Sequence, residues 1–266
     1  MAALSSGDPF RLDGRIAFVS GAAGHLGRAM TLALARAGAH VILNGRDEGR
    51  LRDFERELSA EKLSAERAAF NVMDSTKVRE FFAGRQRLDI VVNNAVSMTA
   101  KPMADLTPDD FGATYRSQVT AVFEIARAAR PALKRAAAEA GEASIVNIAS
   151  MYGAVAPDAR LYDSPAKQSP FHYGPAKAAL LQLTRHLAAE FGADRIRVNA
   201  LVPGPFPAPA VVEKEPSFAE RLSARTMLGR IGGSEEIAGP LLFLASRASS
   251  FVTGAALAVD GGWTAW

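Results

Sequence analysis

Short apolar runs alternate along the chain with longer segments that have the pattern of helices. Continuous apolar runs are typical of strands that are buried on both faces of a parallel sheet. The predicted strands are Ile16–Ser20, Ala39–Asn44, Ala68–Val72, Leu88–Val92, Ser144–Ala149, Ile196–Leu201 and Ala255–Val259. Strands that alternate with helices predict an α/β fold: a doubly wound parallel sheet in a single three-layer α/β/α domain.

Amphipathic or alanine-rich patterns predict the helices between these strands. The predicted helices are Arg28–Ala37, Glu48–Leu58, roughly Pro108–Ala138, the run that begins near Tyr173, and a helix around Glu235–Ala245. Pro131 is expected to kink or break the long helix, because proline cannot donate a backbone hydrogen bond. Residues 1–14 are expected to be a flexible lead-in, and residues 15–266 form the predicted domain.

Composition narrows the class of protein. The chain has 266 residues, is 48% hydrophobic and carries a net charge of +3. Lysines and arginines are scattered among acids, so a nucleic-acid surface is not indicated. Cysteine is absent, which excludes disulfide and thiol chemistry, and no metal site is predicted. Without a long apolar stretch or an apolar signal-peptide core, we expect a soluble cytoplasmic protein with no membrane partner.

Three residues are candidates for one catalytic site: Ser150, Tyr173 and Lys177. Tyr173 and Lys177 are spaced to share one face of a helix. The lysine charge can lower the pKa of the phenol enough only in a partly desolvated cleft. A cation about 4 Å from the phenolate attracts it by roughly 1 kcal/mol in water, but by about 4 kcal/mol at an effective dielectric of 20. Ser150 follows a predicted strand and is expected at its carboxyl end, where α/β sheets bind ligands. The alternative is an ordinary solvated Tyr–Lys pair on a helix surface.

The segment after the first strand contains three glycines, Gly21, Gly24 and Gly27, and leads into a helix. A strand, a glycine-rich turn and a helix in this order predict a Rossmann-type dinucleotide site. The glycines allow a tight turn and a close approach of the backbone to a pyrophosphate at the helix N-terminus.

The ordered set of motifs resembles the short-chain dehydrogenase/reductase family over nearly the whole chain. The motifs are SGAAGHLG (20–27), DIVVNNA (89–95), SIVNIAS (144–150), YGPAK (173–177), IRVNALVPG (196–204), LGRIGGSEEIAGPLLFLAS (228–246) and TGAALAVDGG (253–262). The resemblance implies an NAD(P)-dependent oxidoreductase that acts on a carbonyl or alcohol. It also implies a homotetramer or homodimer and a mobile substrate loop over residues 203–226.

The resemblance assigns roles to residues of this chain. Tyr173 is expected to be the acid/base, Lys177 to lower its pKa and hold the nicotinamide ribose, and Ser150 to bind the substrate oxygen. Gln118 aligns with the asparagine that completes the family's catalytic tetrad. The cofactor-binding residues implied are Gly21, Ala23, His25, Leu26, Gly27, Arg46, Asn71, Val72, Asn94, Ala95, Tyr173, Lys177, Pro203, Gly204 and Phe206.

The chain departs from the family pattern at several positions. Ser20 replaces a threonine, His25 a glycine, Asn71 an adenine-binding aspartate, Val96 a glycine, Gln118 an asparagine and Ala208 a threonine. His25 faces the cofactor phosphates or is a structural accommodation. Gln118 is longer than asparagine, which puts a water-borne proton relay in doubt. These departures support the alternative function, a non-catalytic dinucleotide-binding sensor or scaffold, whereas the intact Ser150, Tyr173 and Lys177 favour an enzyme.

Cofactor preference depends on the end of the second strand. Family members that prefer NAD carry an acid there, whereas this chain has Gly45 followed by Arg46. Without a carboxylate to repel a 2′-phosphate, and with Arg46 to pair with it, we expect NADP to be favoured over NAD. The alternative is that Arg46 is a solvated turn residue.

The segment between Ser150 and Tyr173 is longer than in many family members, and the extra length falls in Pro157–His172, here called the insert. Its charged residues, including Arg160, would favour a small-molecule substrate such as a sugar, polyol or sugar acid if they face the pocket. The alternative is that the insert packs against a neighbouring subunit or covers the sheet edge. The segments LDGRIAFVSGAAGHLGRAM and VILNGRD resemble gluconate 5-dehydrogenase-like members, in agreement with a sugar substrate.

Overall fold

The computed structural model describes residues 7–266. Within them, seven strands form one sheet with the order β3-β2-β1-β4-β5-β6-β7, and every neighbouring pair is parallel. The strands are β1 (Ile16–Ser20), β2 (His40–Gly45), β3 (Ala65–Ala69), β4 (Ile90–Asn93), β5 (Ala143–Ile148), β6 (Ile196–Pro203) and β7 (Ala256–Val259). The predicted doubly wound parallel sheet is confirmed, and its order reverses between β1 and β4, where such sheets bind ligands.

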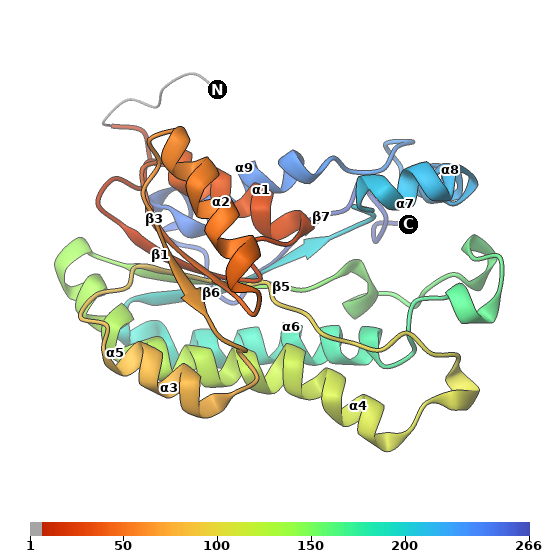
Figure 1. Cartoon of the computed structure of the whole chain (residues 1–266), viewed down its shortest axis with the longest axis horizontal. Helices are drawn as coiled ribbons and strands as arrows, with labels where there is room; N and C mark the ends of the chain where they lie inside the picture. The colour runs from red at the N-terminus through yellow and green to blue at the C-terminus, as the bar shows by residue number, and fades with distance from the viewer. Residues whose placement is uncertain (1–6) are drawn as a thin grey trace.

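Helices cover both faces of the sheet (Figure 1). The helices are α1 (His25–Arg36), α2 (Glu48–Ala60), α3 (Ser75–Ala83), α4 (Pro108–Tyr115), α5 (Ala121–Ala140), α6 (Tyr173–Phe191), α7 (Pro209–Lys214), α8 (Pro216–Arg225) and α9 (Ala238–Ala245). One buried cluster joins the sheet to α1, α2 and α9, and a second joins it to α3, α5 and α6. The three-layer arrangement therefore has two cores, one on each side of the strands.

The third strand lies earlier than its apolar run predicts. The sequence indicates Ala68–Val72, whereas β3 is Ala65–Ala69 at the edge of the sheet. An edge strand is only partly covered, so its polar side chains are tolerated and hydrophobicity does not mark it. Phe70 and Val72 instead follow the carboxyl end of β3 and line a cleft there.

Helix α3 was not predicted from the sequence, because only two of its side chains, those of Val78 and Phe82, are buried. Asp74 caps it by accepting hydrogen bonds from the amides of Thr76 and Lys77. Helices α7 and α8 lie within residues 203–226, the segment expected to be the substrate loop, and Pro209 and Pro216 each occupy a first helical position. Proline is well suited to that position because it has no amide hydrogen to leave unpaired.

The long helix is interrupted, but not at the position predicted. Pro131 lies inside the continuous helix α5, and the expected break there is wrong. The interruption is the π-helical segment η2 (Arg116–Thr120), which separates α4 from α5 and contains Gln118. Single π-helical turns occur often at functional sites, because they re-aim the side chains they carry.

The predicted flexible lead-in falls partly on residues 1–6, which lie outside the described residues. Its described part is anchored. The side chain of Leu12 is buried in the core, and its amide donates a hydrogen bond to the carbonyl of Ala37. Packing at Leu12 thus fixes the end of the lead-in to the core, and flexibility of the residues before it stays a prediction.

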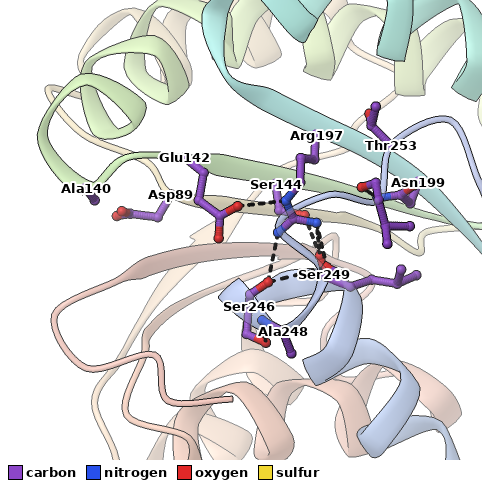
Figure 2. A network of polar contacts seen from close by, with 12 residues as sticks. Asp89, Ala140, Glu142, Ser144, Arg197, Asn199, Ser246, Ala248, Ser249 and Thr253 are labelled. Carbon is purple, nitrogen blue, oxygen red and sulfur yellow. Dashed lines mark hydrogen bonds and ion pairs between the residues drawn. The ribbon is translucent and has the colours of Figure 1, made fainter. Parts of the chain in front are cut away.

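A network of ionic and hydrogen-bonded groups lies at the edge of the sheet opposite the ligand-binding edge, and Figure 2 shows it around Arg197. Arg197, near the start of β6, pairs with Glu142 at 2.9 Å. It also donates to the carbonyls of Leu244 and Ser246 and to the hydroxyl of Ser249. These bonds tie α9 and the turn after it to the central strands.

No helix among residues 7–266 is long and apolar enough to cross a membrane.

Candidate active site

The three residues predicted to be catalytic come together at the carboxyl edge of the sheet. Ser150 follows β5, and its hydroxyl accepts a hydrogen bond of 3.2 Å from the amide of Tyr152. Tyr173 is the first residue of α6, and the Ser150 hydroxyl is near enough to favour the ionised form of its phenol. Lys177 lies one turn further, and its ammonium nitrogen is 5.6 Å from the centre of the Tyr173 ring. A strand end and a helix start thus place a hydroxyl, a phenol and an ammonium in one cluster.

Burial controls the charges in this cluster. Lys177 is 5% exposed, and desolvation lowers its pKa to about 7. Burial raises the pKa of the Tyr173 phenol, and the nearby Ser150 hydroxyl only partly opposes that rise. The expected lowering of the Tyr173 pKa by Lys177 stays a prediction. The same burial that strengthens the attraction between the two groups also disfavours the charge on each of them.

Gln118 is buried, and neither atom of its side-chain amide has a hydrogen-bond partner among the described residues. One turn before it, Thr114 lies 3.4 Å from the ring nitrogen Nδ1 of His172, and one turn after it, Val122 packs with Leu180. This register places Gln118 beside α6 at the level of Lys177. Unsatisfied buried amides are rare and call for an explanation, such as a bound water or a functional partner.

A cleft of about 390 Å³ opens at the carboxyl ends of β1, β2 and β4. Ten residues predicted to bind the cofactor line it: Gly21, His25, Leu26, Gly27, Arg46, Asn71, Val72, Asn94, Ala95 and Phe206. Further residues that the sequence did not mark also line the cleft: Asn44, Phe70, Met73, Ser97 and Ser117. Of these, Asn44 was detectable, because it ends a predicted strand at the ligand-binding edge.

Five predicted cofactor residues are not among those that line this cleft. Tyr173 and Lys177 belong to the catalytic cluster described above. Ala23 lines a different cavity, next to α1, and its carbonyl accepts a hydrogen bond from the Arg50 guanidinium. Pro203 ends the buried strand β6, and Gly204 packs so closely on Asp260 that a Cβ there would lie 2.5 Å from the Cα of Asp260.

The glycine-rich turn fits a dinucleotide phosphate group. Gly21 has φ of +66°, and a Cβ on Gly27 would lie 2.0 Å from the carbonyl oxygen of Gly21. Gly24 precedes α1 and provides no side-chain cap, so the first amides of that helix are available to an anion. His25 is the first residue of α1 and is exposed at the cleft.

Ser20 and Asn94 join the first and fourth strands beneath this turn. The Ser20 hydroxyl accepts hydrogen bonds from the amides of Asn94 and Ala95, at 2.9 and 3.0 Å. The Asn94 side chain donates in turn to the carbonyls of Ser20 and Gly21. A serine hydroxyl makes these bonds without the threonine methyl, which explains why the departure at Ser20 is tolerated.

The far end of the cleft carries the residues that would face an adenosine. Gly45 ends β2, and Arg46 follows it with an exposed side chain. Asn71 also lines the cleft, and its side-chain oxygen accepts a hydrogen bond from the amide of Met73 at 3.1 Å. This end therefore presents a cation and an amide, with no carboxylate among the cleft-lining residues.

None of the charged residues of the insert is among those that line the cofactor cleft. The Arg160 side chain is 89% exposed and pairs with Asp158. Other parts of the insert, Pro165 and residues 168–171, line a separate cavity of about 600 Å³ together with Lys101, Tyr152 and the start of α6. The insert thus contributes to a cavity near the site, but Arg160 does not.

Comparisons with known proteins agree with this geometry. Residues 21–264 match the family model described as enoyl-(acyl carrier protein) reductase. The chain is 35% identical to gluconate 5-dehydrogenase of Gluconobacter oxydans, over 98% of this chain and 99% of that protein. It is also 35% identical to galactitol 2-dehydrogenase (L-tagatose-forming) of Cereibacter sphaeroides, over 97% and 98% of the two chains. The crystal structure of a gluconate 5-dehydrogenase from Burkholderia cenocepacia in complex with NADP and tartrate superposes with a TM-score of 0.85 at 33% identity, covering 97% of this chain and 98% of that one.

Proposed function

The chain belongs to the short-chain dehydrogenase/reductase family and is an NAD(P)-dependent oxidoreductase, and we propose that it uses NADP to interconvert a hydroxyl and a carbonyl group of a sugar acid or polyol. Its relatives are dehydrogenases and reductases, which argues against the non-catalytic sensor or scaffold. The observation that carries the proposal is the cluster in which Ser150 follows β5, Tyr173 begins α6, and the Lys177 ammonium lies 5.6 Å from the centre of the Tyr173 ring.

The chain's own residues account for the proton transfer. A bound nicotinamide dinucleotide supplies the hydride donor or acceptor. The Ser150 hydroxyl orients the substrate oxygen, and Tyr173 donates a proton to that oxygen in reduction or accepts it in oxidation. Because burial raises the pKa of Tyr173, the phenol is neutral at physiological pH and is ready to act as the acid. Lys177 lies beside the ring of Tyr173, with its ammonium 5.6 Å from the ring centre, and is proposed to hold the nicotinamide ribose.

Support for NADP comes from the adenosine end of the cleft. Arg46 is exposed there, and Gly45 replaces the acid that would repel a 2′-phosphate. A guanidinium binds phosphate with paired, charge-assisted hydrogen bonds. The similar structure from Burkholderia cenocepacia holds NADP, in agreement with this assignment.

Support for a sugar acid or polyol comes from the names of the relatives, which act on gluconate and galactitol. The test is a panel of sugar acids, keto-sugars and polyols beside steroids and acyl-chain ketones, followed by the absorbance of the reduced cofactor. We expect efficient turnover in the first group. Turnover confined to acyl-chain ketones would contradict the substrate class and would agree instead with the acyl-carrier description of the family model.

We further propose that residues 15–266 act as one catalytic domain, that residues 203–226 form the substrate loop, and that the protein is a cytoplasmic homotetramer or homodimer. Phe111, Tyr115 and Phe123 are large and exposed on α4 and α5, and an interface between copies would bury them. Light scattering on the purified protein measures the oligomeric state.

A further inference from the structure

The insert lies against α8 at one end of the molecule (Figure 1). Arg221 of α8 donates hydrogen bonds to the carbonyl of Leu161, at 2.8 Å, and to the carboxylate of Asp163, at 2.7 Å. Lys167 pairs with Glu215, the residue that precedes α8, at 3.2 Å. Three polar contacts thus connect the insert with the second helix of the proposed substrate loop.

Apolar contacts reinforce this connection. The ring of Tyr162 lies 5.5 Å from the ring of Phe218, centre to centre. A buried cluster joins the insert, α8 and the turn after Ser150; its members are Leu161, Leu222, Met151 and Trp263. Burial of these side chains makes the insert and α8 one packed unit, because each covers apolar surface of the other.

The same insert also reaches the catalytic segment. The hydroxyl of Tyr162 lies 2.8 Å from the hydroxyl of Tyr152 and forms a hydrogen bond with it. The amide of Tyr152 in turn donates to the hydroxyl of Ser150, within the turn η3 (Met151–Gly153) that follows β5. Burial raises the pKa of Tyr152 and of Tyr162, so both phenols stay neutral and the pair persists at neutral pH.

We propose that Tyr162 is a positioning residue for the reaction: it latches α8 to the turn that carries Ser150, so that closure of the substrate loop and alignment of Ser150 are coupled. The proposal rests on the proposed function, since it assumes that Ser150 orients the substrate. Its physical basis is that one side chain both packs against the ring of Phe218 of α8 and hydrogen-bonds with Tyr152. When α8 moves away to release product, Tyr162 moves with it and the turn after Ser150 loses a fixed contact.

The first test uses Tyr162→Phe, Tyr152→Phe and the double variant. Each single change removes the same hydroxyl pair but keeps the ring. We expect each to lower kcat about fivefold, as the loss of one net hydrogen bond predicts, with the Kd for NADPH and Tm nearly unchanged. Because both hydroxyls serve one bond, the double variant is expected to lose no more than either single variant. A role in stability alone would lower Tm and leave kcat of the folded protein unaltered, which would overturn the proposal.

The second test does not depend on turnover. Hydrogen exchange is measured on the full chain with and without NADPH, and we expect the amides of α8 and of residues 151–153 to exchange faster in Tyr162→Phe. Arg160→Gln is the matched control, because Arg160 belongs to the insert and, among residues 7–266, forms its ion pair with Asp158 alone. Exchange at wild-type rates in Tyr162→Phe overturns the latch. Normal turnover in Tyr173→Phe would instead overturn the catalytic assignment. The coupling of α8 to the turn after Ser150 would then be judged from the hydrogen-exchange rates alone.

Discussion

The ammonium nitrogen of Lys177 lies 2.7 Å from the carbonyl oxygen of Ile148 and donates a hydrogen bond to it. This contact joins α6 to the end of β5, immediately before the segment of Ser150. Close packing supports it, since a Cβ on Gly153 would lie 2.9 Å from the carbonyl carbon of Lys177. The two elements that carry the catalytic side chains are therefore held in one rigid frame.

Tyr173→Phe removes the proton that the proposed mechanism transfers. Turnover is expected to fall by a factor of about 100 to 10,000, which is the usual contribution of a general acid or base. The ring remains, so the cleft and the Kd for NADPH should change little. Steady-state kinetics and fluorescence titration with NADPH measure the two quantities, and near-normal turnover would exclude Tyr173 as the acid/base.

The low pKa of Lys177 makes stability depend on pH. In the folded chain this lysine titrates at about 7, whereas the ordinary value is 10.5. Below about pH 7, both the folded and the unfolded chain hold the proton, and the folded state bears the full cost of a buried charge. As the pH rises from about 7 towards 10.5, only the unfolded chain retains the proton, so the free energy of unfolding increases.

Urea unfolding of the wild type and of Lys177→Met isolates this contribution. Between about pH 7 and 9, the wild type should gain on the order of 2 kcal/mol relative to the variant, which has no proton to release at this position. Parallel stability profiles for the two proteins would show that Lys177 keeps its charge when buried.

Arg46→Gln removes the cation at the adenosine end of the cleft while leaving a side chain of similar length. The loss of a charge-assisted hydrogen bond predicts a Kd for NADP that is about tenfold higher. The Kd for NAD should not change, because NAD has no 2′-phosphate. Calorimetric titration with both cofactors measures the two Kd values. Equal increases in the Kd for NADP and for NAD would assign Arg46 to a general electrostatic role. Tighter binding of NAD than of NADP by the wild type would contradict the NADP preference.

Arg197→Met breaks the buried network shown in Figure 2. It removes the partner of Glu142 and one of the two side-chain donors to each of the carbonyls of Leu244 and Ser246, which also accept from the hydroxyls of Ser144 and Ser249. Arg197 is buried but Glu142 is partly exposed, so the loss is expected to lie below the about 3–5 kcal/mol that removing one member of a fully buried ion pair costs. The control is Arg127→Met, which breaks the exposed pair with Glu124 and should cost under about 1 kcal/mol. Denaturant unfolding measures both, and equal costs would show that the network contributes no more than a surface pair.

Much of this protein was predictable from the sequence because the signals are local. A buried parallel strand is apolar along its whole length, so β1, β2, β4, β5 and β6 stand out. The glycine-rich turn requires glycines at fixed positions, whatever surrounds it. The four-residue spacing of Tyr173 and Lys177 places them on one helical face before any tertiary contact forms.

Other features depend on contacts between distant parts of the chain. The position of β3 is set by pairing with β2 at the sheet edge, where hydrophobicity carries little information. The direction of the insert is set by Arg221 and Phe218, which follow it along the chain by many residues. The pKa values of Tyr173 and Lys177 are set by burial, which no spacing of residues reveals. Sequence therefore determined which groups meet at the site, whereas only the tertiary structure decided their charge and what holds them in place, because desolvation and long-range packing arise only when the whole fold has formed.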